Sequence, residues 1–167
     1  MNTKKLMGAV GLAILFGACA TPTPPSQSHD IYLVRHAEKE SGPDPVLTAE
    51  GQERAEALAG RLTDAGITHV HSTDTRRTRL TAAPVTDLTG RTVEIYDPRD
   101  LEGFAGELLA ERGSHIVVGH SNTTPQLAEA LGCGPQAPIV EATEYDRLYV
   151  VSVGRAGVDC RVERFGR

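Results

Sequence analysis

The sequence predicts an α/β fold of three layers, α/β/α, in which a mostly parallel central sheet lies between two layers of helices. Two observations carry this prediction. Short apolar runs such as 31–34 and 115–118 are typical of strands that are buried on both faces. Segments of helical periodicity alternate with these runs along residues 30–167, as in a parallel sheet. The length of 167 residues allows one domain, and 40% hydrophobic with 23% charged residues is an ordinary globular composition.

Each element follows from a local signal. The strand 31–34 leads directly into Arg35 and His36. Thr48 is suited to cap the next helix, which ends at Gly66 and has one apolar face made of Ala55, Leu58, Ala59 and Leu62. The remaining elements follow in order: strand 69–72, helix 77–88, strand 92–96, helix 101–112, strand 115–118, helix 124–131 ending at Gly132, and a hairpin of 148–153 and 158–162 turned at Gly154 and Gly157.

The N-terminal residues stand apart from this domain. Residues 1–18 combine Lys4 and Lys5 with a short apolar run, and small residues precede Cys19, so the segment resembles a bacterial lipoprotein signal. That resemblance implies cleavage before Cys19 and lipidation of its thiol, hence export and an anchor in the cell envelope or periplasm, with the outer membrane favoured. A plain signal peptide is the alternative. Residues 19–29 are expected to form a Pro-rich tether, followed by the domain at 30–167.

Charge and cysteine content narrow the possible partners. The net charge of −5 gives no basic excess to neutralise a phosphate backbone, so we expect no nucleic-acid partner. If Cys19 carries lipid, Cys133 and Cys160 remain as an even pair in an oxidising compartment. The pair is either a disulfide or two small core residues, since spacing alone decides nothing. The oligomeric state is left open.

Three polar motifs follow predicted strands. The first is Arg35-His36-Ala37-Glu38, the second runs from Ser72 through Arg77 to Thr81-Ala82, and the third is Gly119-His120-Ser121. In α/β sheets, ligands bind beyond the carboxyl ends of strands, so these motifs are candidates for one site.

Together, and in this order, the three motifs closely resemble those of the histidine phosphatase superfamily, which has the phosphoglycerate-mutase-like fold. The resemblance covers residues 30–163 and favours the small, phosphohistidine-phosphatase-like branch. It implies that His36 is the nucleophile, that Arg35 and Arg77 bind the substrate phosphate, and that His120 is the second histidine of the site. Counting back four residues from Thr81 selects Arg77 rather than Arg76.

The chemistry fits those residue types. Guanidinium groups match phosphoryl oxygens in geometry and charge, and a neutral imidazole can attack phosphorus to form a phosphohistidine. His120 can donate to the charge that develops on the phosphoryl oxygens. The scheme needs no metal and no cofactor. His69 and His71 could suggest a metal site together with His36 and His120, but we expect them to be ordinary strand residues, as we do His115, and we assign His29 to the tether.

The sequence leaves three carboxylates as candidates for the general acid that protonates the leaving group. Asp100 and Glu102 lie in the segment where many members of the superfamily carry the acid, but both also suit the start of a helix. Glu38 follows the nucleophile. A phosphohistidine substrate has an easier leaving group and needs no strong acid.

These observations predict a metal-independent phosphatase of the cell envelope. It would hydrolyse phosphomonoesters or phosphoramidates, acting on a small phosphorylated substrate or a phosphorylated envelope component. The alternative is a catalytically idle lipoprotein that binds phosphorylated or other anionic ligands through the same residues.

Overall fold

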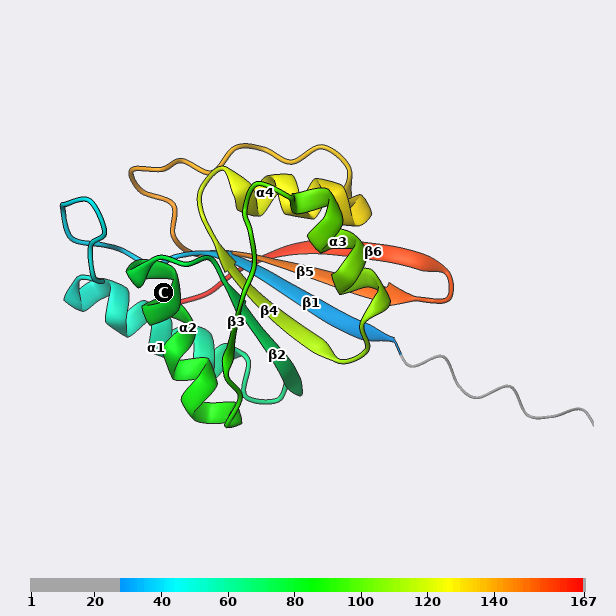
Figure 1. Ribbon diagram of the computed structural model, residues 1–167, viewed down its shortest axis with the longest axis horizontal. Coiled ribbons are helices and arrows are strands. Elements are labelled where there is room, and N and C mark those ends of the chain that lie inside the picture. Colours follow the sequence, from blue (N-terminus) through cyan, green and yellow to red (C-terminus); the bar gives the residue numbers. More distant parts are fainter. Residues whose placement is uncertain (1–27, 167) are drawn as a thin grey trace, which may run out of the picture.

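The computed structural model describes residues 28–166, which form a six-stranded sheet with helices on both faces (Figure 1). This confirms the predicted fold class. In chain order the elements are β1 (His29–Arg35), α1 (Ala49–Arg61), β2 (Ile67–Ser72), α2 (Arg76–Thr89), β3 (Val93–Ile95), α3 (Leu101–Ala110), β4 (Ser114–Gly119), α4 (Thr123–Ala128), the π-helical turn η1 (Glu129–Cys133), β5 (Arg147–Gly154) and β6 (Gly157–Arg164).

The strand order brings the carboxyl ends of β1, β4 and β2 together at one end of the sheet. The order is β3-β2-β4-β1-β5-β6, with β3, β2, β4 and β1 parallel, β5 antiparallel to β1 and β6 antiparallel to β5. In register, Arg35 lies opposite Gly119 and Ser72 lies opposite Val118. The carboxyl ends of β1, β4 and β2 are therefore neighbours, as the sequence analysis requires.

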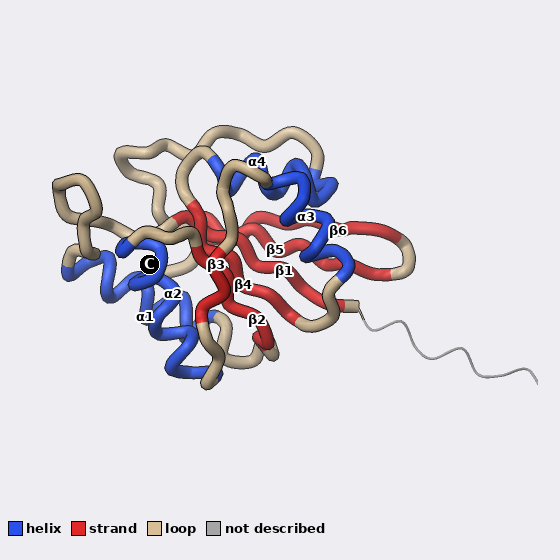
Figure 2. Tube along the Cα trace, viewed as in Figure 1, coloured by secondary structure: helices blue, strands red, loops and turns tan. Residues whose placement is uncertain are grey.

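Helices cover the sheet in two layers. Helices α1 and α2 lie on one face, and α3, α4 and η1 lie on the other (Figures 1 and 2). The central strand β1 contributes to both cores because its side chains alternate between the two faces. Tyr32 and Val34 pack in the core that includes residues of α1 and α2, whereas Ile31 and Leu33 pack in the core that includes residues of α3 and α4.

Local signals account for most helix boundaries. The Thr48 hydroxyl accepts a hydrogen bond from the Gly51 amide at 3.1 Å, so Thr48 caps α1 as predicted. A Cβ atom on Gly51 would lie 2.1 Å from the Glu38 carbonyl oxygen, so only glycine lets α1 approach the loop after His36 this closely. The predicted helix 124–131 is instead α4 continued by η1, and Gly132, inside the last turn of η1, adopts a φ of +98°.

One N-terminal assignment is corrected. His29, assigned to the tether, is the first residue of β1 and pairs with Val153, and its Nε2 lies 3.1 Å from the Leu108 carbonyl oxygen. The strand begins earlier than its apolar run because pairing with β5 satisfies its backbone. Residues 1–18, Cys19 and the rest of the tether up to residue 27 lie outside the described residues. Within 28–166, no helix combines the length and apolar character needed to cross a bilayer.

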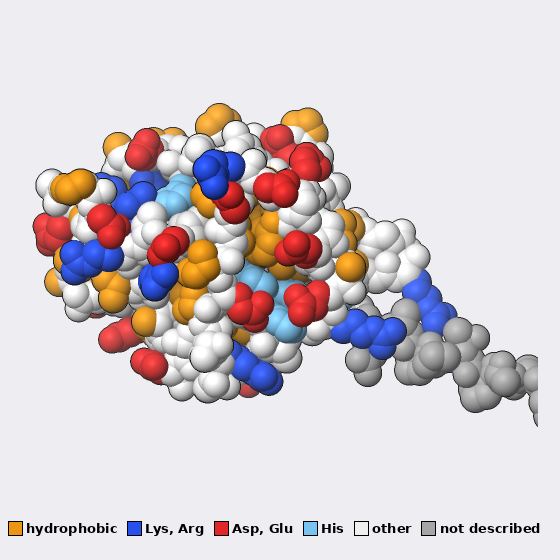
Figure 3. Space-filling view, in the orientation of Figure 1, with side chains coloured by type: hydrophobic (Ala, Val, Ile, Leu, Met, Phe, Trp, Pro, Cys, Tyr) orange, Lys and Arg blue, Asp and Glu red, His pale blue; other side chains and the backbone are white. Residues whose placement is uncertain are grey.

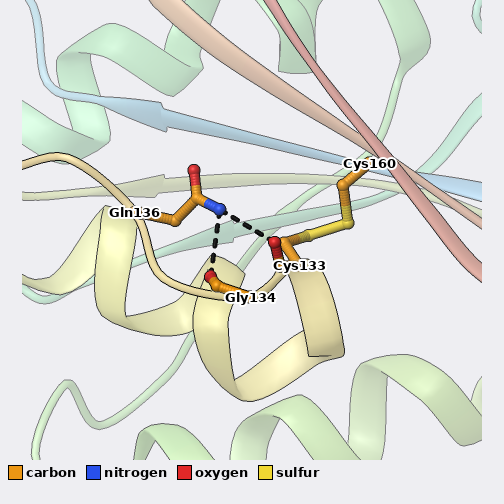
Figure 4. Close-up of a disulfide and its surroundings, with 4 residues drawn as sticks. All are labelled: Cys133, Gly134, Gln136 and Cys160. Atoms are coloured by element: carbon orange, nitrogen blue, oxygen red, sulfur yellow. Dashed lines mark hydrogen bonds between the residues drawn. A yellow bond between two sulfur atoms is a disulfide. The ribbon is translucent and has the colours of Figure 1, made fainter.

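Cys133 and Cys160 form a disulfide, which decides the question that their spacing left open (Figure 4). The bond joins the end of η1 to β6, one of the two edge strands of the described sheet, with the two Cα atoms 5.5 Å apart. The Gln136 side-chain amide donates to the carbonyl oxygens of Cys133 and Gly134, each at 3.0 Å. These contacts hold the chain that leaves η1 against the bridge.

We expect this disulfide to contribute measurably to stability. It closes a loop with a sequence separation of 27, for which loop entropy gives roughly 2–4 kcal/mol. The double variant Cys133→Ala/Cys160→Ala should lose that much unfolding free energy in urea, and thiol titration of the denatured, unreduced wild-type domain should detect neither cysteine. Free thiols at both positions in protein produced under oxidising conditions would contradict the prediction.

Candidate active site

Four side chains from the three motifs meet at the carboxyl edge of the sheet. His36 follows β1, and its backbone amide donates to the Gly119 carbonyl oxygen at 2.9 Å. His120 follows β4, and its ring centroid lies 5.6 Å from that of His36. Arg77, in the first turn of α2, places Nη2 3.4 Å from His120 Nδ1. Arg35, the last residue of β1, completes the group.

The His36 ring is held with one nitrogen free. Its Nδ1 lies 2.8 Å from the Ala37 carbonyl oxygen, which can only accept, so Nδ1 carries the proton and Nε2 keeps its lone pair. The residue is only 3% exposed. Burial, reinforced by the charges of Arg35 and Arg77, lowers the pKa of His36 to about 3. The ring is therefore neutral and oriented, as a nucleophile must be.

Arg35 is buried beside His36 and is held from the other side by the loop before β5. Its Nη1 donates to the carbonyl oxygens of Glu141 and Glu144 at 2.8 and 3.1 Å, and its guanidinium lies 4.1 Å from the centre of the Tyr145 ring. Burial lowers the pKa of Arg35, but an arginine stays charged at neutral pH. Among the described residues, the buried Nε atoms of Arg35 and Arg77 have no hydrogen-bond acceptor. Buried, unpaired donors of this kind favour an anionic ligand.

Within the second motif, the Thr81 side chain holds the backbone of Arg77 in place. The Thr81 hydroxyl donates to the Arg77 carbonyl oxygen at 2.8 Å and accepts from the Ala37 amide at 3.0 Å. This single side chain therefore ties the start of α2 to the loop after the nucleophile. Arg76 instead uses its amide to contact Asp44, and Arg79 pairs with Asp74 at the surface. Of these three arginines, Arg77 is the one that contacts His120.

His120 is oriented by a residue that the sequence analysis did not single out. Thr73 donates its hydroxyl proton to Thr78, so it accepts from His120 Nε2 at 2.9 Å. The Nδ1 atom of His120 then faces Arg77 as an acceptor. Burial, followed by the charges of Arg77 and Arg35, lowers the pKa of His120 to about 4. The available signal was a hydroxyl directly after β2, within the second motif.

Gly119 must be a glycine for His120 to take this position. A Cβ atom at Gly119 would lie 2.8 Å from the Tyr96 hydroxyl oxygen and 3.0 Å from Thr124 Oγ1. The hydroxyl groups of Tyr96, Thr123 and Thr124 therefore occupy the space that a side chain at this position would need. Any side chain here would displace the strand end on which both histidines depend.

Two of the three candidate acids, Glu38 and Asp100, have partners outside the site. Glu38 accepts from Arg54 Nε at 2.7 and 2.8 Å, and Asp100 caps α3 by accepting from the Gly103 amide at 3.0 Å. Glu102 is exposed in the first turn of α3. Within 28–166, none of these three carboxylates has a hydrogen bond or ion pair to Arg35, His36, Arg77 or His120.

Two further residues border the site. Asp44 Oδ1 lies 3.9 Å from Arg77 Nη1, and the Tyr145 ring lies 6.3 Å from that of His36. Asp44 belongs to the loop after the nucleophile, whereas Tyr145 lies far from all three motifs in sequence. No local pattern could have indicated Tyr145, because only the fold brings its loop over Arg35.

Comparison with known sequences agrees with this arrangement. A sequence model of the histidine phosphatase superfamily (branch 1) matches residues 31–111. The chain is 41% identical over 90 residues to the probable phosphoglycerate mutase GpmB of Serratia proteamaculans, covering 49% of this chain and 41% of that protein. It is 38% identical over 105 residues to the GpmB of Escherichia fergusonii, covering 58% and 48% respectively. The chain thus spans less than half the length of these relatives.

Solved structures share the fold over most of both chains. The protein histidine phosphatase SixA, in complex with tungstate, has a TM-score of 0.67 at 17% identity, covering 82% of this chain and 97% of that one. A mycobacterial glucosyl-3-phosphoglycerate phosphatase has a TM-score of 0.66 at 14% identity, covering 84% and 99%. Over residues 31–111 the chain is therefore similar in sequence to the histidine phosphatase superfamily, and the solved structures show the same fold over most of its length.

Proposed function

We propose that this chain is a phosphatase that hydrolyses phosphomonoesters or phosphoramidates through a phosphohistidine at His36. The observation that carries the proposal is the neutral, buried His36, whose Nδ1 is paired so that Nε2 keeps its lone pair, beside the buried Arg35 and the half-buried Arg77. The paired Nδ1 fixes the direction of the ring, and the guanidinium groups provide the charge that a phosphoryl group needs.

In the first step, His36 Nε2 attacks phosphorus, the N–P bond forms and the P–O or P–N bond to the leaving group breaks. Arg35 and Arg77 bind the equatorial phosphoryl oxygens, whose charge would otherwise repel the nitrogen lone pair. The neutral ring needs no general base, because its attacking nitrogen carries no proton. The leaving group takes a proton from solvent or from a group at the mouth of the site.

In the second step, water attacks the phosphohistidine, the N–P bond breaks and inorganic phosphate leaves with His36 neutral again. His120 supports both steps. A bound phosphoryl dianion favours the imidazolium form of His120, because opposite charges attract in a buried site, and the protonated Nδ1 then donates to a phosphoryl oxygen. Thr73 keeps Nε2 occupied throughout and so holds the ring in place.

The chain architecture supports hydrolysis rather than phosphoryl transfer between two sites on a sugar acid. The connection from β3 to β4 is short and is largely taken up by α3, so few residues remain to cover the mouth of the site. Water can then reach the phosphohistidine. The named mutase relatives are more than twice as long as the segment that they share with this chain.

We propose the cell envelope as the location, with a lipid anchor at Cys19, on the strength of the N-terminal signal alone. A location there favours a small phosphorylated substrate or a phosphorylated envelope component. A protein that only binds such ligands is the alternative function, and turnover distinguishes the two.

We expect His36→Ala to abolish turnover of p-nitrophenyl phosphate by the full chain. The variant should also lose the acid-labile, base-stable phosphate that wild-type protein carries when quenched during turnover, since only a ring nitrogen forms that bond. His29→Ala, a histidine at the far end of the same strand, serves as the control. Turnover above a few per cent in His36→Ala contradicts the covalent mechanism, and phosphate binding without wild-type turnover supports the binding protein.

We expect Arg76 and Arg77, which are adjacent in the sequence, to differ sharply in their effect on kcat/KM. Arg77→Ala should lower kcat/KM by a factor on the order of 10²–10³, as for removal of a donor that stabilises transition-state charge, and His120→Ala should fall in the same range. Arg76→Ala should change kcat/KM less than about threefold, because its side chain lies at the surface near Asp44. Equal losses in the two arginine variants would remove Arg77 from the phosphate site.

The pKa values predict how the two histidines titrate. Because the pKa of His36 is about 3 and that of His120 about 4, both rings should stay neutral as the pH falls from 8 to about 5. Imidazole ¹⁵N NMR of the free protein tests this directly. Saturating inorganic phosphate should raise the pKa of His120, since the anion stabilises imidazolium. Protonation of either ring near pH 6.5 in the free protein would contradict the buried, cation-flanked site.

A further inference from the structure

A second group of histidines lies on the α3 face of the sheet, away from His36. Strands β2 and β4 are adjacent and in register, so His69 lies opposite His115, and His71 is two residues further along β2 on the same face. One ring nitrogen from each of the three lies within 4.8 Å of the others. Within 28–166, their rings pack against one another and against His29 and Phe104, not against His36 or His120.

The hydrogen bonds of the cluster leave ligand atoms in suitable positions. His115 Nε2 lies 3.3 Å from the Glu111 carbonyl oxygen, which can only accept, so His115 Nδ1 holds a lone pair. That lone pair faces His71 Nε2 at 3.0 Å. A carbonyl acceptor behind a histidine ring is the arrangement that orients metal-binding histidines in proteins.

Carboxylates lie beside two of the three rings, those of His69 and His71. Glu94 Oε1 lies 3.3 Å from His69 Nδ1, Glu94 Oε2 lies 3.8 Å from His71 Nδ1, and Glu111 Oε1 lies 3.7 Å from His69 Nδ1. His71 also lines a cavity of about 310 Å³ whose wall carries five acidic side chains: Glu94, Asp97, Asp100, Glu107 and Glu111. Figure 3 shows histidine side chains with acidic side chains beside them over this part of the sheet. The surroundings therefore attract a cation.

We propose that His69, His71 and His115 bind one divalent transition-metal ion, with Zn²⁺ as the best match. Imidazole nitrogens are preferred ligands of this ion, and three of them leave one tetrahedral position for water or the Glu111 carboxylate. The ion takes the place of the proton between His71 Nε2 and His115 Nδ1. That proton moves to His71 Nδ1, which lies 3.8 Å from Glu94 Oε2, so His71 changes tautomer, both rings stay neutral and no proton is lost.

Binding requires one local movement. The His69 ring stacks on that of His115 at 4.6 Å between centroids, and its Nδ1 lies 3.3 Å from Glu94 Oε1, so the ring must turn for a nitrogen to reach a shared ion. Its side chain is 22% exposed, against 5% for His71, and can turn about χ2 to direct a nitrogen inward. The bound ion would then join β2 to β4 as a structural tie, independent of the chemistry at His36.

Zinc titration of the full chain, prepared without a polyhistidine tag, tests the proposal. Calorimetry should show one site, and Co²⁺ in its place should give the intense visible bands of tetrahedral coordination. Zinc at about 100 times its Kd should raise the melting temperature by roughly 5–10 °C. His69→Gln should weaken binding at least about tenfold, since even partners outside the ligand set matter by that factor.

Two control variants separate this site from others. His29→Gln removes a neighbouring ring outside the cluster, and His36→Ala removes the nucleophile; both should bind zinc as the wild type does. Phosphatase turnover should survive EDTA, because the ion is not at the site of reaction. The proposal is overturned if wild-type protein binds no zinc, if His69→Gln binds it equally well, or if His36→Ala abolishes binding. The Co²⁺ spectrum of the unmutated chain decides the matter if His69→Gln fails to fold.

Discussion

The hydrogen bond from the His36 amide to the Gly119 carbonyl oxygen is the contact on which the active site depends. It extends the parallel ladder of β1 and β4 one residue beyond β1, at the point where both chains turn away from the sheet. His36 is thereby kept beside the strand that ends in His120. Gly119 permits this because its missing side chain leaves room for Tyr96 and Thr124. The position of the nucleophile is thus a property of backbone pairing, and its side chain needs only one further contact, to Ala37.

Around that backbone, the site concentrates positive charge without placing it on the nucleophile. Arg35 and Arg77 stay charged, while burial and those same charges keep His36 and His120 neutral. Burying guanidinium groups is costly, and Arg35 recovers part of that cost from two carbonyl oxygens and the Tyr145 ring. The Nε atoms of Arg35 and Arg77 have no acceptor among the described residues, so a bound anion would offset the rest of this desolvation cost. The charge of the site consequently favours an anion and disfavours a cation.

The α3 face of the same sheet has the opposite character. There, carboxylates lie beside the histidine cluster, and β4, which is followed by His120, carries His115 near its start. One strand therefore serves an anion site at its carboxyl end and a candidate cation site near its amino end. The disulfide between Cys133 and Cys160 joins β6, the outer strand of the β5–β6 hairpin, to η1 in the helical layer.

The sequence by itself determined the elements, because these depend on local periodicity, and it predicted the four site residues through motifs that resemble those of a known family and each occupy a few consecutive positions. It identified Thr48 as a cap and selected Arg77 over Arg76 for the same reason. Only the tertiary structure decided which distant residues meet. It paired Cys133 with Cys160, brought Tyr145 over Arg35, gave Glu38 to Arg54 and Asp100 to a helix cap, and assembled His69 and His71 with His115 rather than with His36. Such contacts arise from strand order and register, and no short stretch of sequence encodes either.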